Sequence, residues 1–245
     1  MMILSMQLLK PIILSLNQSG EPMPDETTPT NPRMKVVRVP ERGAYDRETV
    51  YKTFDDGYLC HVGYESDNGP VVLPTLYGRH EDSVYFHGSP AAGMFRRAKS
   101  DAEVSLTVTH VDGFVLARSL FHHSMNYRSV VAIGKPERVI DKQEINFGLE
   151  VITENCLPGR WAEARKPNEV ELRQTAVYKI SITDASVKAR EGAPGDDEED
   201  VELDIWAGVF PVVTGIGAPI PAPDFTAGTD LPSAISTFSR VSADS

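Results

Sequence analysis

The chain has 245 residues and a formal net charge of −11, with 41% hydrophobic and 24% charged residues. This is the composition of a globular protein that is long enough to bury a core without disulfide or metal staples. Nucleic acids and anionic membrane surfaces both attract basic patches, which an acidic balance disfavours. We therefore expect neither a nucleic-acid partner nor a membrane partner.

The cysteines and the N-terminal residues indicate the cellular compartment of the protein. Cys60 and Cys156 form no CxxC pair and are too few for a disulfide framework, which is typical of buried thiols in a reducing compartment. The apolar start MMILSMQLLKPIILSL is interrupted by Lys10-Pro11 and has no cationic segment before it, which disfavours the alternative of a signal peptide. No apolar run approaches the ~20 residues of a membrane span. We expect a cytoplasmic protein.

Composition along the chain predicts three regions. Residues 1–33 end in the polar, proline-rich stretch SGEPMPDETTPTNP, and we expect them to form a disordered extension, with Met23 or Met34 as alternative first residues. Residues 34–221 form the expected folded domain. Residues 222–245 are rich in proline, alanine and serine and are expected to be a flexible tail.

The folded part begins with a predicted strand, a turn and a short helix over 36–51. Three short strands separated by turn signals follow, at 58–64, 71–77 and 83–87. Asn68-Gly69, between the first two, is a strong hairpin signal. Pro74 inside the second strand indicates an edge, a bulge or a place where the ladder opens.

The middle of the chain combines a helix start with alternating strands. Ser89 is a good N-cap and Pro90 fits the first helical position, so a helix is predicted to follow in AAGMFRRAKSD. The segments 103–111 and 114–120 alternate with period two, and Asp112-Gly113 between them predicts the clearest hairpin of the chain. A further strand is predicted over 128–139, with a kink at 134–136.

The last third predicts two helices and two apolar segments. Asp141 stands at capping-box spacing from Glu144, and its helix should run to Cys156 and stop at Pro158-Gly159. A short helix at 167–174, a strand at 176–182, an acidic solvated connector at 191–204 and an apolar segment at 206–213 that docks on the body follow. Many short antiparallel strands with few helices predict a mainly β fold, a barrel with helical additions.

The common catalytic motifs are missing. The chain has no HExxH, GxSxG, Walker loop or GxGxxG. Of its six histidines only His122 and His123 are adjacent, and adjacent residues on a strand point to opposite faces. We therefore expect no metal site and no hydrolytic triad.

Three segments carry candidate binding chemistry. At Tyr85–Pro90 a strand passes into a helix through Gly88-Ser89, where free backbone N–H groups and the helix dipole favour a phosphate; an ordinary capped helix is the alternative. The segment 117–129 gathers Arg, His, Ser, Asn and Tyr side chains, which suit a phosphate or a stacked ring, or simply a polar loop. The apolar strand 72–77, with Thr75 as its hydroxyl residue, could lie along a planar heteroaromatic ring or be a plain core strand.

Together these segments describe a site for a flat, phosphorylated ligand. The runs HVGYESDNGPVVLPTLYGRHEDSVYFHGSPAAGM, VSLTVTHVDGFVLARSLFHHSMNYRSVVAIGKPE, LPGRWAEARKPNEVEL and DIWAGVFPV closely resemble the flavin-nucleotide-binding branch of the pyridoxamine 5′-phosphate oxidase-like superfamily. This branch is also similar to the nitroimidazole-resistance proteins. The resemblance extends from about Val36 to Pro221.

The resemblance implies an FMN-binding split barrel, a six-stranded antiparallel Greek-key barrel with flanking helices, that forms homodimers with FMN in a cleft between subunits. It implies that the isoalloxazine ring and ribityl chain lie along Pro74, Thr75, Leu76 and Tyr77. It implies that the phosphate end, or the wall beside it, is held by His87, Gly88 and Ser89. It implies that the flavin pocket is closed by Asn126, Tyr127, Arg128 and Ser129.

Two departures from the family pattern narrow the activity. The phosphate turn reads Ser89-Pro90-Ala91-Ala92, with no cation before Arg96, and no histidine follows His123. Vitamin B6 oxidation is therefore not expected. Nitroimidazole reduction stays open because His87 lies in an FHG motif that resembles that subfamily's.

These observations predict an FMN-dependent oxidoreductase that acts on a small molecule, with NAD(P)H as a possible electron donor. Arg128 or a backbone N–H in 72–75 would stabilise reduced flavin, and His87 or His123 would pass protons. A non-catalytic flavin-binding or storage module is one alternative. A haem-binding split barrel, with His122 or His123 as the axial ligand, is another.

Overall fold

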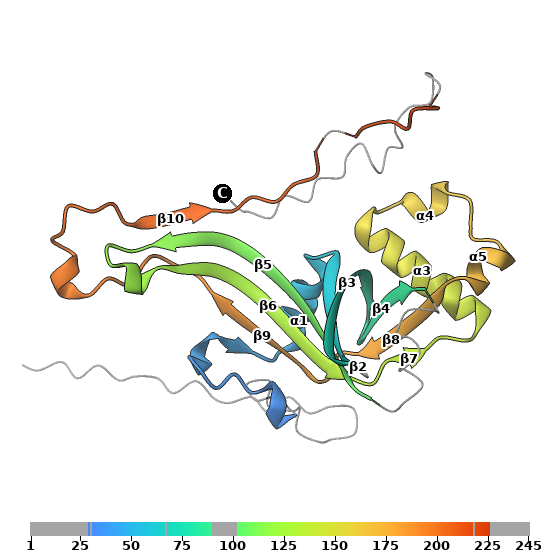
Figure 1. The fold of residues 1–245 in the computed structure, drawn as a ribbon, viewed down its shortest axis with the longest axis horizontal. Helices are drawn as coiled ribbons and strands as arrows, with labels where there is room; N and C mark the ends of the chain where they lie inside the picture. The colour runs from blue at the N-terminus through green and yellow to red at the C-terminus, as the bar shows by residue number, and fades with distance from the viewer. Residues whose placement is uncertain (1–28, 30, 67, 90–101, 218, 226–245) are drawn as a thin grey trace, which may run out of the picture.

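The computed structural model describes residues 29, 31–66, 68–89, 102–217 and 219–225, and they form a mostly antiparallel β structure with few helices (Figure 1). Ten strands join in one sheet, in the order β1-β9-β6-β5-β2-β3-β4-β8-β7, with β10 beside β5. The strands are β1 (Gly43–Ala44), β2 (Leu59–Ser66), β3 (Gly69–His80), β4 (Ser83–Gly88), β5 (Val104–Leu116), β6 (Ser124–Gly134), β7 (Glu137–Arg138), β8 (Ala176–Ser181), β9 (Ala185–Arg190) and β10 (Gly208–Pro211). The helices are α1 (Arg47–Asp55), α3 (Lys142–Cys156), α4 (Arg160–Glu163) and α5 (Glu169–Arg173). The predicted mainly β fold is confirmed.

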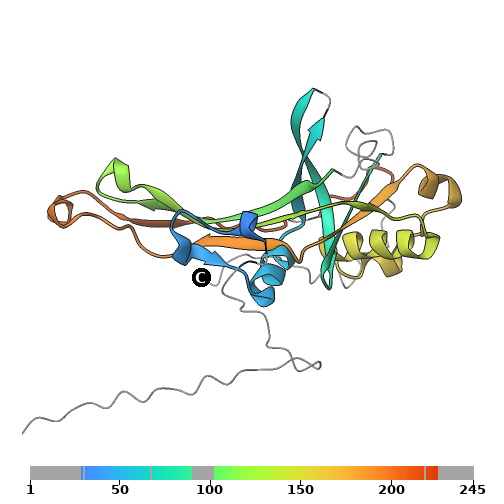
Figure 2. The ribbon, with the colours of Figure 1, turned by 90° about the horizontal axis from the view of Figure 1, so that it is seen from below.

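The sheet curls around one apolar core, and α1 packs on its inner face (Figures 1 and 2). Asp46 caps α1 by accepting a hydrogen bond from the Thr49 N–H at 2.8 Å. Val50 and Phe54 lie one helical turn apart, and both are buried against the sheet. We call the core-facing side of the sheet the inner face and the opposite side the outer face.

Helix α3 covers part of the outer face, over β3, β4 and β8. A second apolar cluster forms beneath it from Tyr85, Val139, Ile152 and Val177. The helix approaches β3 closely at Gly78, where an added Cβ would lie 2.3 Å from the Val151 carbonyl oxygen. Beyond this contact the outer face of β2, β3, β5 and β6 is not covered by a described helix (Figure 2).

The β2–β3 hairpin follows the prediction. Gly69 begins β3 with a φ of 104°, which favours glycine, and the two strands then pair from Ser66↔Gly69 to Leu59↔Leu76. Strand β4 pairs with β3 only over Tyr77–His80. Pro74 therefore lies where the ladder is open on the β4 side, as predicted.

The predicted hairpin at Asp112-Gly113 is wrong. Strand β5 runs through this dipeptide, with a β-bulge between Val111 and Gly113. At the bulge the Asp112 carboxylate faces Arg128 of β6, which donates two hydrogen bonds to it. The carboxylate thus finds its hydrogen-bond donors on the neighbouring strand, whereas in a turn it would be solvated by water. The chain reverses instead at the short 3-10 helix Leu120–His122, which Ser119 caps.

The later elements agree with the sequence except at strand β9 and at the short helix α4, which was not predicted. Asp141 accepts from the Glu144 N–H at 2.9 Å, and α3 ends at Cys156, before Gly159 with a φ of 85°. Helix α5 carries a capping box, and β8 and β10 lie inside their predicted segments. Strand β9 was not predicted. The helix predicted after Ser89 lies outside the described residues.

The described part of the first region contacts the body. Arg33 donates to both carboxylate oxygens of Glu103, at 2.8 and 3.0 Å, and Asn31 donates to Asp184. Residues 1–28 and 226–245, on which the predicted extension and most of the predicted tail fall, lie outside the described residues. None of the helices in the described part of the chain combines the length and apolar character that a bilayer-spanning helix requires.

Candidate functional site

Strand alternation divides the predicted site residues between the two faces of the sheet. On β3, Pro74 and Leu76 face outward, whereas Thr75 and Tyr77 lie on the side of the buried Cys60. On β6 the outward pair is Tyr127 and Ser129, and their neighbours Asn126 and Arg128 face inward with the buried Val130. The continuous motifs of the sequence therefore supply alternate residues to two different environments.

The outer face brings the outward residues of β3 and β6 onto one surface. His61 on β2 pairs with Pro74 on one side and with Thr107 of β5 on the other, and Thr107 pairs with Val131 of β6. Neighbouring strands lie about 4.8 Å apart, so this row spans about 14 Å. The next row along β5 and β6 joins the Thr109 and Ser129 hydroxyls at 2.9 Å. The surface between β3 and β6 carries hydroxyl groups and the His61 imidazole.

Exposed apolar side chains border this surface at both ends. On β2 and β3 they are Leu59, Val72 and Leu76. Along β5, β6 and β10 they are Val111, Phe114, Met125 and Phe210, and the Trp206 ring lies tilted against Phe210 at a centroid distance of 5.1 Å. Val72 is 62% exposed and Phe114 is 55% exposed. An apolar patch of this extent on a sheet is typical of a binding surface.

His87 lies on the outer face where the cover of α3 ends. Its neighbours Val84 and Phe86 belong to the inner core, while Tyr85 belongs to the cluster under α3. Among the described residues, the His87 Nδ1 atom is buried and has no hydrogen-bond partner. Burial lowers the pKa of this imidazole, which favours its neutral form.

The predicted phosphate turn lies directly after His87. Gly88 ends β4 opposite Ala176, and Ser89 follows at the surface. The Thr75 hydroxyl donates to the His87 carbonyl oxygen at 3.2 Å, which fixes the end of β4 against β3. The rest of the turn, from Pro90, lies outside the described residues.

Three of the predicted residues have side chains committed to the inner side. The Tyr77 ring is fully buried, and its hydroxyl donates to the Phe54 carbonyl oxygen. The Asn126 amide donates to the Gly192 carbonyl and accepts from Arg190. Only the backbone of these strand residues reaches the outer face.

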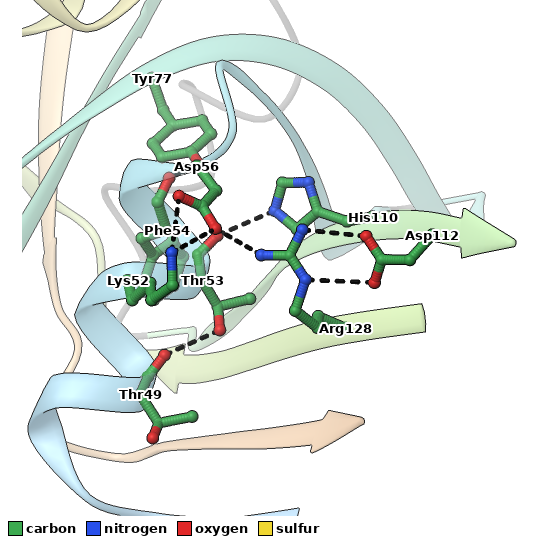
Figure 3. A network of polar contacts seen from close by, with 9 residues as sticks. All are labelled: Thr49, Lys52, Thr53, Phe54, Asp56, Tyr77, His110, Asp112 and Arg128. Carbon is green, nitrogen blue, oxygen red and sulfur yellow. Dashed lines mark hydrogen bonds and ion pairs between the residues drawn. The ribbon is translucent and has the colours of Figure 1, made fainter. Parts of the chain in front are cut away.

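Arg128 is the third, and it is the centre of a polar network (Figure 3). Its Nε and Nη2 atoms donate to Asp112 at 3.1 and 3.0 Å, and its Nη1 atom donates to Asp56 at the end of α1. Lys52 completes the network at 3.3 Å from Asp56. Hydrogen bonding to Asp112 raises the pKa of Arg128, so the guanidinium stays charged and its charge is balanced on the inner side.

The remaining histidine candidates lie elsewhere. His110, opposite Arg128, has its Nε2 atom 2.9 Å from the Thr53 carbonyl oxygen. At the tip of the β5–β6 hairpin, His122 Nε2 lies 3.0 Å from Asp197 and His123 Nδ1 lies 3.0 Å from the Ser119 carbonyl oxygen. Both histidines thus have local partners. They belong to the connection at the far end of the β5–β6 hairpin, which we call the β5–β6 arm, and this end lies far from β4 (Figure 1).

Sequence reasoning missed part of the outer face. His61, Thr107 and Thr109 lie between the two predicted groups of residues and connect them. The alternation in SLTVTHV was recognised as a strand, but the hydroxyls at its alternate positions were not recognised as a binding face. A strand with hydroxyl residues at its outward positions and valine and leucine at its inward positions indicates an exposed polar face that could bind a ligand.

The pyridoxamine 5′-phosphate oxidase family model matches residues 46–189. The flavocytochrome Anf3 from Azotobacter vinelandii is 36% identical, with a TM-score of 0.80, over 85% of this chain and 97% of that one. The FAD and haem binding protein from Mycobacterium smegmatis is also 36% identical, with a TM-score of 0.76, over 80% of this chain and 96% of that one.

A more distant structure has the same fold. The 5-nitroimidazole antibiotic resistance protein from Bacteroides thetaiotaomicron, named as putative, is 22% identical, with a TM-score of 0.51, over 60% of this chain and 85% of that one. No curated protein matches the chain. The family match, the extent of the two closer similarities and the antiparallel sheet agree, and the chain belongs to the pyridoxamine 5′-phosphate oxidase-like family of split-barrel proteins.

Proposed function

We propose that this protein binds a flavin nucleotide on the outer face between β3 and β6, binds haem beside it, and works as an oxidoreductase on a small molecule. The observation that carries the proposal is the similarity to two proteins over most of their length. One is named a flavocytochrome and the other an FAD and haem binding protein, each 36% identical to this chain. Both names combine a flavin with haem.

The geometry of the outer face supports the flavin part of the proposal. A planar ring system needs a flat surface with apolar contacts and a few neutral hydrogen-bonding groups. The rows that contain Thr107, Thr109 and Ser129 provide the hydroxyls, and Leu76 and Val111 border them. A bound flavin would supply the redox chemistry, while the chain supplies binding and orientation.

FMN and FAD are distinguished by the nucleotide that the protein releases. The family resemblance implies FMN, whereas the Mycobacterium smegmatis relative is named for FAD. Both carry the same ring, ribityl chain and first phosphate. We therefore propose a flavin nucleotide, either FMN or FAD, as the cofactor.

The same face supports a homodimer. Phe114 is 55% exposed, Phe210 is 54% exposed and Val72 is 62% exposed, all on a sheet face without a described covering element. A second copy of the chain would bury these side chains and enclose the flavin between subunits. The electron donor in this proposal is NAD(P)H from solution, and the protein acts in the cytoplasm.

The test is an absorption spectrum of the purified protein, with chromatography of the nucleotide released by heat and a pyridine haemochrome assay. We expect flavin bands, FMN or FAD in the supernatant, and about one haem per chain after haem is supplied. A colourless protein that takes up neither added flavin nor haem would reject the proposal. Steady-state NAD(P)H oxidation with a nitro or quinone acceptor separates an enzyme from a non-catalytic flavin carrier.

A blocking substitution locates the flavin. Thr109→Trp places an indole in the middle of the outer face, and we expect flavin content per chain to fall by at least about tenfold, which corresponds to roughly 1.4 kcal/mol of binding. The matched control is Glu48→Trp, which puts the same side chain at an exposed position of α1, behind the sheet. Equal flavin content in Thr109→Trp and the native protein would show that the flavin binds elsewhere.

A further inference from the structure

His87 stands at the boundary between the covered and the open parts of the outer face. It pairs with Val177, which is 1% exposed beneath α3. On its other side, Tyr77 pairs with Phe86, so the next positions, Leu76 and His87, lie side by side. Leu76 pairs in turn with Leu59, and each of these leucines is 42% exposed. The His87 side chain therefore lies between a buried cluster under α3 and an exposed apolar surface on β2 and β3.

The ring of His87 has an unmet bonding capacity. Its Nδ1 atom is buried and lacks a hydrogen-bond partner among the described residues. A buried polar atom without a partner is unfavourable, and in a native structure it calls for a specific cause such as a bound ion or water or a redox or catalytic role.

The other histidines have local roles. His110 is bonded to the Thr53 carbonyl, His122 to Asp197 and His123 to the Ser119 carbonyl. His80 packs edge-on against Phe147 at a centroid distance of 4.9 Å. His61 is exposed in the row proposed for the flavin, between Pro74 and Thr107. His87 alone among these combines a buried, unpartnered ring nitrogen with an apolar platform at its side.

We propose that His87 is the axial ligand of the haem iron, with the macrocycle lying against Leu76 and Leu59. This inference rests on the proposed function, because it assigns the ligand of the haem proposed there. An apolar macrocycle suits the leucine surface, since it removes both side chains from water. The placement also brings haem next to the flavin row, since Leu76 is two residues from Pro74 on the same face of β3. The assignment replaces His122 and His123, which the sequence had suggested.

The test is haem titration of the native protein and of His87→Ala, followed by absorption and electron paramagnetic resonance spectra of the ferric form. We expect His87→Ala to lose the histidine-ligated spectrum and to bind haem more than about tenfold more weakly. Removing a residue that only supports a metal ligand already lowers the affinity by about tenfold or more, so removing the ligand itself should lower it further. Adding free imidazole should restore the spectrum in this variant. His87→Gln fills the same space and should also lose the spectrum, which covers the case in which the alanine variant fails to fold.

His123→Ala is the matched control and should keep the native haem spectrum. Flavin content of each variant reports whether the outer face is intact. If the native protein binds no haem, the haem part of the proposed function fails, and this inference fails with it. If the native protein binds haem and His87→Gln keeps the native spectrum and affinity, the ligand assignment alone is overturned.

Discussion

At Arg128, one guanidinium balances the carboxylates of Asp112 and Asp56, which come from β5 and from the residue after α1. The Arg128 side chain is 28% exposed, so water screens these charges only in part. The contacts join the helix that fills the core to the two strands that carry the outer face. Arg128, which the family resemblance suggested for a flavin pocket, thus links the strands of the outer face to α1 from the inner side.

We expect Arg128→Met to lower the free energy of unfolding by about 1–3 kcal/mol, because it leaves the half-buried Asp112 without a counter-charge and Asp56 with only the exposed Lys52. The value should fall below that for a fully buried pair because these groups retain some water. Denaturant unfolding followed by circular dichroism measures it. The matched control is Arg165→Met, whose pair with Glu171 is 69% and 43% exposed, so that water screens it and its loss should have a much smaller effect. Equal losses in the two variants would contradict a special role for the network.

Among the elements, the contact between α3 and β3 sets the edge of the open face. Gly78 lets the helix backbone rest on the strand, and Asn155 of α3 donates to the carbonyls of Gly57 and Tyr77 at 3.0 and 2.8 Å. These contacts fix how far α3 extends over the outer face. They therefore fix where the packed surroundings of His87 give way to the exposed Leu76.

We expect Gly78→Ala to destabilise the protein by about 1–3 kcal/mol, because the new Cβ would lie 2.3 Å from the Val151 oxygen and 2.6 Å from its carbon. Neither atom can move without shifting the helix. Gly195→Ala is the control: its Cβ would meet nothing within 4 Å, and the change should stay within about 0.5 kcal/mol. Thermal unfolding of both variants measures the difference, and an unchanged melting temperature in Gly78→Ala would disprove the close packing.

The elements also explain what the sequence could predict. Helix α3 was found with its cap and its end because Asp141, Glu144 and Gly159 are local signals. The Asp112-Gly113 turn was wrong because the partner that keeps Asp112 in a strand, Arg128, is remote in sequence. Strand β9 was missed because ASVKAR has weak β propensity, and its pairing with β6 creates the strand.

The candidate site was predictable to a similar degree. The motifs select three strands, β3, β4 and β6, because the motif residues occur in continuous runs. They could not separate Ser129 from Arg128, since the two faces of a strand are decided by what packs on each. They also could not join β3 to β6, because β2 and β5 lie between them in the sheet order.

Over the whole molecule, the exposed apolar side chains of the outer face lie on β3, on β5 and β6, and on β10. Figure 1 shows β5, β6 and β10 running side by side away from β3. Phe114 lies near the middle of the arm, paired with Met125 on one side and Phe210 on the other. A charge at this position would be buried if a second copy covered the face. The homodimer that we propose would therefore depend on a residue that is exposed in the single chain.

We expect Phe114→Glu to convert a dimer into a monomer at micromolar concentration, because burying an unpaired carboxylate costs several kcal/mol. Light scattering coupled to size exclusion measures the mass. Ile140→Glu is the control, since Ile140 is 84% exposed in the connection before α3, away from the arm. A native protein that is already monomeric, or a Phe114→Glu variant that stays dimeric, would contradict the proposed interface.

Strand β10 has a consequence for how the chain tolerates shortening. Beyond the residues of β5 that pair with β2, the backbone of 113–116 is paired by β10, and the Val212 N–H extends this contact to Asp112. A chain truncated before Gly208 would leave that stretch as a bare sheet edge beside Phe114 and Val115. Such an edge invites a strand from another molecule. Strand β10 therefore protects β5 from pairing with another molecule. We expect a protein truncated before Gly208 to aggregate while its apolar core stays folded.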